Sequence, residues 1–144
     1  MSRLIRPLLA AALTAVAFSP STPARAAGDV EVALAGGQFV PLVTQVPAGS
    51  SLTFVNRDVT NYPMVIGNHN VIPDHVGTAV PGAKPFPTSS NLIAPGSKWT
   101  CPVGAGGGLT CTGLDGKATP VPPGTYAIAC GLHPNQMHAL IVVQ

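Results

Sequence analysis

Short apolar runs, each ended by Gly or Pro, follow one another along residues 27–144. Short runs that are rich in β-branched and aromatic residues are typical of buried β-strands. No window of this region keeps the 3.6-residue apolar period that indicates an amphipathic helix. Short strands separated by Gly/Pro turns predict an all-β fold, a Greek-key β-sandwich or barrel of about eight strands. The expected strands cover residues 29–34, 42–46, 51–56, 64–72, 97–101, 109–112, 125–130 and 138–143.

A different pattern marks the N-terminus, where residues 1–26 have the three parts of a secretory signal peptide. Arg3 and Arg6 form a charged start, residues 8–18 form an apolar stretch, and residues 24–26 read Ala-Arg-Ala, an A-x-A cleavage site. The apolar stretch is too short to span a membrane. We therefore expect an exported protein, periplasmic or extracellular, with no membrane span and with a single domain over residues 27–144.

Removal of this signal changes the charge of the chain. The full chain has 7 basic and 5 acidic residues. Three of the basic residues, Arg3, Arg6 and Arg25, lie in the signal, so four remain against five acidic residues and the net charge becomes −1. A protein that binds nucleic acid needs a basic patch. The sequence therefore predicts no nucleic-acid partner.

The candidate chemistry lies near the C-terminus. Two apolar runs, 126–130 and 139–143, flank a short polar loop, and Cys130, His133 and Met137 lie at or between their ends. A thiolate, an imidazole and a thioether are soft ligands that suit copper, and a His2Cys site with a weak axial Met is the blue-copper arrangement. A second histidine has to come from elsewhere in the chain. The alternative is a core Cys and a core Met, since both residue types are common in protein interiors.

The cysteine count also bears on this loop, because three cysteines in an exported chain leave one unpaired. Cys101 and Cys111 bracket a Gly-rich segment that can bring them together at a hairpin tip. A disulfide there would stabilise the fold by about 2–3 kcal/mol. This pairing leaves Cys130 free, and a free thiol in an oxidising compartment is a liability unless it has a use. The alternatives are another pairing, or a Cys130 that is only buried.

Four segments resemble the cupredoxin family. Residues 39–41 and 46–58 are similar to its opening, with a Pro-x-Gly turn and a strand that ends in Asn. Residues 92–99 resemble the turn and strand that precede the copper loop, and residues 123–130 resemble the approach to that loop. Together these segments extend over most of residues 27–144. The resemblance implies a cupredoxin-like copper-binding domain that holds one type 1 copper ion.

The resemblance also implies the missing ligand. Residues 61–72 are similar to the azurin and auracyanin pattern, in which a His-Asn pair lies six residues beyond a Pro. His69 is therefore the first choice for the second equatorial histidine. The full metal-ligand set implied by the resemblance is His69, Cys130, His133 and Met137.

Two asparagines that flank this histidine receive roles from the same resemblance. The side chain of Asn70 would tie the two ligand loops together, as groups outside the ligand set often do. The carbonyl of Asn68, where azurin has Gly, would approach the metal as a weak axial group. The loop itself is a hybrid, because Cys130 and His133 have the short plastocyanin or amicyanin spacing whereas His133 and Met137 have the azurin spacing.

Two further histidines remain. His75 lies in a Pro/Gly-rich segment, residues 73–87, that is long for a structureless loop. We expect His75 to be a solvated loop residue, with a ligand role in place of His69 as the alternative. His138 follows Met137, and strand alternation would turn the two side chains apart. We expect His138 to be exposed, with an accessory copper contact as the alternative.

These features imply an exported type 1 (blue) copper protein that carries single electrons between redox partner proteins as a monomer. An enzyme is not expected, because the sequence has no paired-carboxylate, Ser/His/Asp or phosphate-loop signature. The first alternative is a copper-binding carrier or buffer protein for copper delivery or tolerance. The second is a cupredoxin-like module that has lost its metal and serves as an interaction domain, against which the retained Cys, His and Met argue.

Overall fold

The strands form where side chains that face the core alternate with side chains that face solvent. In β4 (Ser51–Asn56) and β11 (His138–Val143), every second residue is buried. The computed structural model describes residues 27–58, 67–74, 80–89 and 91–144; they contain eleven strands and one 3₁₀ turn at Ala105–Gly107. No helix among these residues is long and apolar enough to cross a membrane. The other strands are β1 (Asp29–Ala35), β2 (Gln38–Val40), β3 (Val43–Val46), β5 (Ile72–Pro73), β6 (Lys84–Pro85), β7 (Lys98–Cys101), β8 (Leu109–Thr112), β9 (Ala118–Val121) and β10 (Gly124–Ala129).

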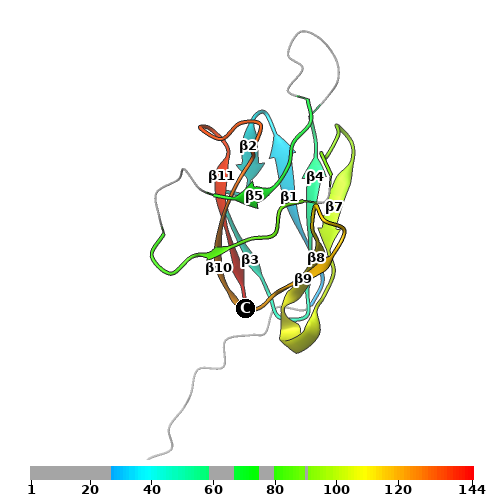
Figure 1. Cartoon of the computed structure of the whole chain (residues 1–144), viewed down its shortest axis with the longest axis vertical. Helices are drawn as coiled ribbons and strands as arrows, with labels where there is room; N and C mark the ends of the chain where they lie inside the picture. Colours follow the sequence, from blue (N-terminus) through cyan, green and yellow to red (C-terminus); the bar gives the residue numbers. More distant parts are fainter. Residues whose placement is uncertain (1–26, 59–66, 75–79, 90) are drawn as a thin grey trace, which may run out of the picture.

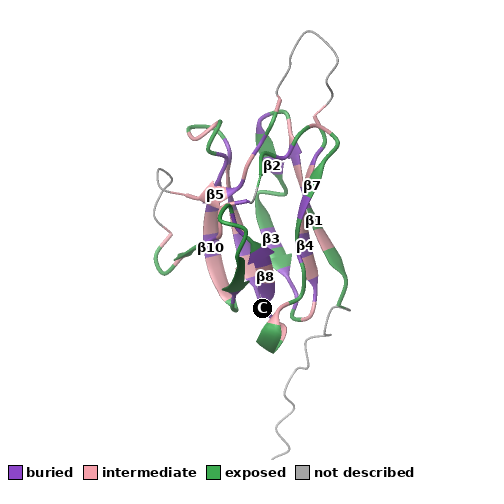
Figure 2. Cartoon of the chain, turned by 45° about the vertical axis from the view of Figure 1, so that its right-hand side comes forward, coloured by how far each residue is buried: buried purple, intermediate pink, exposed green. Residues whose placement is uncertain are grey.

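Two sheets enclose the core (Figure 1). One has the strand order β2-β1-β4-β7, in which β1 and β4 run parallel. The other has the order β3-β11-β10-β5, with β6 also paired to β10 and with β3 parallel to β11. Strands β8 and β9 form a separate hairpin. Buried residues of both sheets, coloured purple in Figure 2, form one cluster, and the all-β fold predicted from the sequence is confirmed.

The main difference from the predicted strands lies in 64–72. The first part of this range lies outside the described residues, and the remainder has a single bridge at His69 and then the two-residue β5. Asn and Gly, which favour turns, precede His69 and limit the pairing. Strands β2, β6 and β9 were not predicted, because β2 is short and because β6 and β9 contain Pro85 and Pro120, which argue against a strand.

Aromatic side chains fill the middle of the sandwich. Phe54 is fully buried and stacks on Trp99 with ring centroids 5.5 Å apart. It also meets Phe39 and Phe86 edge to face, at 6.5 and 6.2 Å. Phe86 in turn meets Tyr126 of the other sheet at 5.5 Å. The cluster therefore connects the two sheets, and Trp99 and Tyr126 are both buried in the core.

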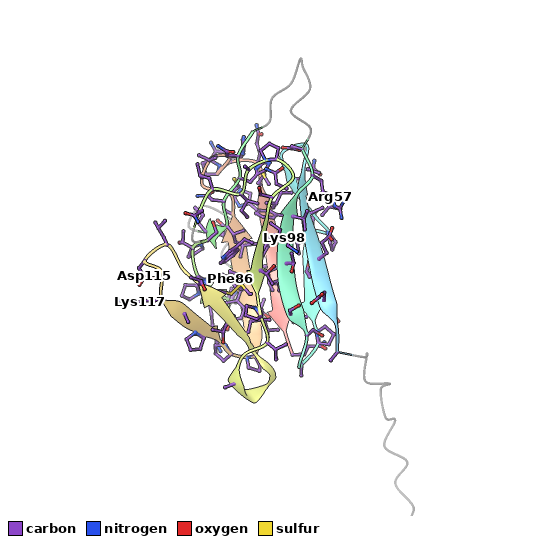
Figure 3. The ribbon with its side chains drawn as sticks, turned by 90° about the vertical axis from the view of Figure 1, so that its right-hand side faces the viewer. Arg57, Phe86, Lys98, Asp115 and Lys117 are labelled. Carbon is purple, nitrogen blue, oxygen red and sulfur yellow. A yellow bond between two sulfur atoms is a disulfide. The ribbon has the colours of Figure 1, made fainter. Side chains whose placement is uncertain are left out.

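A disulfide links the first sheet to the β8–β9 hairpin. It joins Cys101 in β7 to Cys111 in β8, with the two Cα atoms 4.4 Å apart, and this is the pairing expected from the sequence. Beyond it, Asp115 and Lys117 lie at the tip of the β8–β9 hairpin (Figure 3). The pairing leaves Cys130 as the free, buried cysteine of the described chain. Its thiol is therefore available for another use.

Candidate metal centre

The loop between β10 and β11 lies at the end of the sandwich opposite the C-terminus (Figure 1). Backbone hydrogen bonds close it. The N–H of Cys130 donates to the carbonyl of Met137 at 3.1 Å, and the N–H groups of His133 and Met137 donate to the carbonyls of Cys130 and His133, each at 3.0 Å. The loop is therefore tight, and the C-x2-H-x3-M spacing gathers all three residues between the ends of two neighbouring strands.

His69 reaches this end of the sandwich from a different segment. Its backbone N–H and carbonyl bond to the carbonyl and N–H of Ile93, at 3.1 and 2.7 Å. The side chain of Asn56, the last residue of β4, donates to the carbonyls of Gly67 at 3.0 Å and Ile93 at 2.7 Å. Because this amide is fully buried, it fixes both the segment that carries the histidine and the segment beside it.

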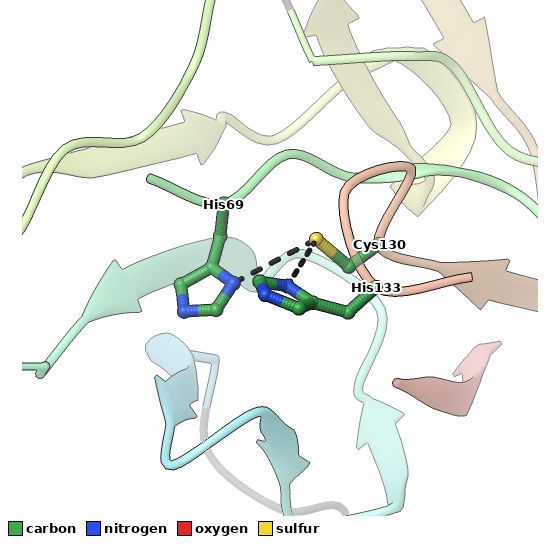
Figure 4. Close-up of side chains that lie close together, drawn as sticks. All are labelled: His69, Cys130 and His133. Carbon is green, nitrogen blue, oxygen red and sulfur yellow. Dashed lines mark hydrogen bonds between the residues drawn. The ribbon is translucent and has the colours of Figure 1, made fainter. Parts of the chain in front are cut away.

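Three donor atoms converge between these segments (Figure 4). The Sγ of Cys130 lies 3.6 Å from Nδ1 of His69 and 3.6 Å from Nδ1 of His133, and the three atoms lie within 4.8 Å of one another. Metal–imidazole and metal–thiolate bonds of about 2.0 and 2.3 Å, at trigonal angles, separate nitrogen from sulfur by about 3.7 Å. The group is therefore positioned to bind one metal ion, and two imidazoles with one thiolate are the trigonal donor set of blue-copper sites.

The other residues of the expected set lie around these donors. Met137 is fully buried, and its role as the axial ligand stays a prediction. The Oδ1 of Asn70 accepts a hydrogen bond from the N–H of Gly131 at 2.7 Å and lies 3.5 Å from Sγ of Cys130. The hydrogen bond joins the segment of His69 to the loop of Cys130. Asn68 is exposed, and the metal contact expected of its carbonyl stays a prediction.

Of the predictions for the two remaining histidines, the described residues test only the one for His138. His75 lies outside the described residues. His138 is not exposed in the way the sequence predicted, since its side chain is 32% exposed and its Nδ1 lies 2.9 Å from Oδ2 of Asp74. The prediction is wrong because Asp74, which follows β5, lies across β10 from His138 and covers it. The metal-binding group contains His69, Cys130 and His133 but not His138.

Electrostatics favour metal binding at the thiol. Burial by itself raises the pKa of Cys130, but hydrogen bonds from the ring of His69, the backbone of Asn70 and the ring of His133 outweigh it and bring the pKa down from 9.0 to about 6. Burial lowers the pKa of His69, whereas hydrogen bonds to Cys130 and Asp58 raise it, and the net result lies above 6.5. The thiol is thus largely ionised at neutral pH, and the thiolate is the form that binds metal.

Ultraviolet titration of the metal-free protein is expected to show the thiolate of Cys130 forming with a midpoint near pH 6. In urea-unfolded protein with the disulfide intact, the same thiol should ionise near 9.0, because its hydrogen bonds are gone. Between these two values the unfolded state binds more protons, so this thiol stabilises the fold above that window and its contribution is lost as the pH falls through about 6. Equal midpoints in the folded and unfolded protein would contradict this account.

One neighbour of the donors was not found from the sequence. The Oδ2 of Asp58 lies 2.8 Å from Nε2 of His69, on the side of the ring away from Cys130. Its only signal was position, two residues after the Asn that ends β4, in a segment similar to the cupredoxin opening. The contact depends on tertiary structure, because it joins residues from two segments that the chain brings together only on folding.

Comparisons with known proteins bear on the fold. No protein-family model matches the chain, and no curated protein sequence matches it significantly. A copper-containing nitrite reductase from Thermus scotoductus SA-01 aligns with a TM-score of 0.52 and 24% identity over 80% of this chain, which spans 22% of that enzyme's chain. A reduced amicyanin variant aligns with a TM-score of 0.50 and 20% identity over 83% of this chain and 86% of its own. Amicyanin from Paracoccus versutus aligns with a TM-score of 0.47 and 18% identity over 86% of both chains. The first two likenesses, which cover 80% and 83% of this chain, show that the chain has the cupredoxin fold.

Proposed function

We propose that this protein is a type 1 (blue) copper protein that carries single electrons between redox partner proteins. The observation that carries the proposal is the convergence of two imidazole Nδ1 atoms on the Sγ of Cys130, each at 3.6 Å. These are the donors that copper takes in a trigonal blue site. The copper-containing nitrite reductase that shares the fold supports the choice of copper.

Copper held here would supply a one-electron change between Cu(II) and Cu(I). The protein contributes a frame that holds its ligands in place. The loop is closed by backbone hydrogen bonds, Asn70 joins it to the segment of His69, and Asn56 fixes that segment in turn. Ligands that are already in place need little rearrangement when the metal changes its charge. Such a frame therefore favours electron transfer.

The proposed exit for the electron is the end of the sandwich that carries His133. This ligand is half-buried, and Leu132 beside it is 50% exposed. Leu92, next to the residue that pairs with the backbone of His69, is 51% exposed. Apolar side chains beside a partly accessible ligand suit the small and transient contacts that redox proteins make.

Copper delivery or buffering is the second candidate. The partial exposure of His133 favours it, because a competing ligand can approach the metal from that side. The two functions differ in what happens to the metal on a change of oxidation state. A carrier of electrons keeps its copper in both states, whereas a delivery protein must release it.

Repeated oxidation and reduction of the copper-loaded protein in the presence of a moderate chelator separates the two. We expect the protein to keep its copper through every cycle, because the ligands are held by the fold and not by the metal. Copper in the protein and in the chelator is measured after each step. A zinc-loaded sample, which does not change oxidation state, controls for simple leakage. Loss of copper at each reduction or oxidation step would replace the electron-carrier proposal with copper delivery.

We further propose that residues 1–26 are a cleaved secretory signal and that the mature protein works as a monomer in the periplasm or outside the cell. The disulfide between Cys101 and Cys111 supports an oxidising compartment, since such bonds persist there. N-terminal sequencing and the solution mass of the protein purified from its own cells test both statements. A mature chain that still carries residues 1–26, or a stable dimer, would contradict them.

A further inference from the structure

We propose that Asp58 is a positioning residue of the metal centre. Its carboxylate fixes His69 in the tautomer that turns a free Nδ1 toward Cys130, and its charge favours the oxidised state of a bound copper ion. The inference rests on the proposed function, because it concerns the same site. It assigns to a residue outside the ligand set a role in setting the reduction potential.

The carboxylate is buried and held from more than one side. The side chain of Asp58 is 7% exposed, and its Oδ1 accepts a hydrogen bond from the backbone N–H of Gly36 at 2.8 Å. Gly36 lies in the turn between β1 and β2 with φ +58°, a conformation that glycine adopts easily. The backbone N–H of Asp58 donates to Oδ1 of Asn56 at 3.0 Å. Asp58 therefore belongs to the same frame that fixes the segment of His69.

These contacts assign the protons of the histidine ring. An ionised carboxylate only accepts hydrogen bonds, and Oδ1 of Asp58 already accepts one from a backbone N–H. The Nε2 of His69, 2.8 Å from Oδ2, then carries the ring proton. In the neutral ring the other nitrogen, Nδ1, is therefore left with its lone pair, 3.6 Å from Sγ of Cys130, and only the protonated ring donates from Nδ1 to the thiolate. A carboxylate behind a metal-binding histidine fixes the tautomer in this way and makes the ligand more basic.

The charge of Asp58 acts on the metal as well. Arg57, the basic residue directly before Asp58, donates to Oε1 of Glu31 at 2.9 Å. Its side chain lies on the outside of the sheet (Figure 3). The thiolate of Cys130 and the carboxylate of Asp58 together balance Cu(II) and leave Cu(I) with an excess negative charge. At an effective dielectric constant of about 20, a buried unit charge on the far side of one imidazole ring changes the ratio of Cu(II) to Cu(I) by on the order of tenfold.

The test removes this charge with little change of shape. We expect Asp58→Asn to keep copper and colour, while the ratio of Cu(II) to Cu(I) at a fixed ambient potential falls about tenfold, which is a rise of 59 mV in potential for a one-electron couple. Asp74→Asn is the matched control, since that carboxylate is also 7% exposed and lies 2.9 Å from a histidine ring nitrogen outside the metal group. Asp58→Glu restores the charge and should restore the ratio.

The proposal is supported if the ratio of Cu(II) to Cu(I) falls threefold or more in Asp58→Asn and changes less in Asp74→Asn. A smaller fall, a change in the opposite direction, or an equal shift in the control overturns it.

The imidazole tautomer gives a readout that needs neither a variant nor copper. Nitrogen-15 NMR of the metal-free wild type, with the ring neutral, should show His69 protonated at Nε2, and protonation at Nδ1 overturns the proposal even if Asp58→Asn does not fold. A wild type that stays colourless with Cu(II) overturns the proposed function instead, and the NMR result then decides the positioning role of Asp58 by itself.

Discussion

Replacement of His69 by alanine is expected to abolish the blue colour of the Cu(II) protein. That colour requires a thiolate bound to copper in a trigonal site, and the variant leaves Cys130 with a single imidazole at 3.6 Å, that of His133. It also leaves the buried carboxylate of Asp58 without its histidine partner. We expect the affinity for Cu(II) to fall by more than about 100-fold, beyond the loss that follows removal of a group outside the ligand set. Visible absorption and competition with a chelator measure the two effects.

Two variants serve as controls. His138→Ala should keep the colour, because that ring pairs with Asp74 and is not part of the metal-binding group. His75→Ala should also keep the colour, because the sequence assigns His75 a ligand role only as the alternative to His69. A blue His69→Ala together with a colourless His75→Ala would contradict the assignment. The second histidine ligand would then be His75, in the Pro/Gly-rich segment 73–87.

Replacement of Phe54 by alanine is expected to lower the free energy of unfolding by about 3–5 kcal/mol. The ring is fully buried, stacks on Trp99 at 5.5 Å and meets two further rings edge to face. The change leaves a cavity between the sheets that rigid aromatic neighbours cannot fill. Urea unfolding of the metal-free protein, followed by tryptophan fluorescence, measures the loss.

Leu114→Ala is the control for this variant. Leu114 is 71% exposed in the β8–β9 hairpin, so its truncation should change the free energy of unfolding by less than about 0.5 kcal/mol. Equal losses in the two variants would mean that the aromatic cluster is not the centre of the core. A loss below about 1 kcal/mol for Phe54→Ala would mean that the core collapses around the cavity.

Most strands can be predicted from the local sequence pattern. The strands that were not predicted can be recognised only from the strands with which they pair. β4 and β11 were predicted with the bounds that the structure shows, because each is a short apolar run next to Gly, Asn or the polar loop. β6 and β9 were not predicted, because a strand that contains Pro is read as a loop unless its partner is known. Only the partner, β10 or β8, shows that these residues complete a sheet.

The candidate site divides in the same way. Cys130 and His133 are close in sequence, so their soft-ligand spacing is visible without a structure. His69 needed the resemblance to a family, because 61 residues separate it from Cys130. Asp58 and the pairing of His138 with Asp74 were missed, since each is a contact between segments whose relative position only the folded chain defines. Single carboxylates in a sequence carry no signal of the ring that they face.

The order of the strands has a consequence for biosynthesis. The edge strand β3 pairs with β11, and the metal-binding loop lies between β10 and β11. A growing chain leaves the ribosome from its N-terminus, so β3 lacks β11, and the ring of His69 lacks Cys130 and His133, until almost all of the domain has been made. Pairings between such distant segments form slowly. The three donors therefore meet only in a complete and folded domain, and metal uptake comes after folding: a chain that stops before β11 has no centre to load.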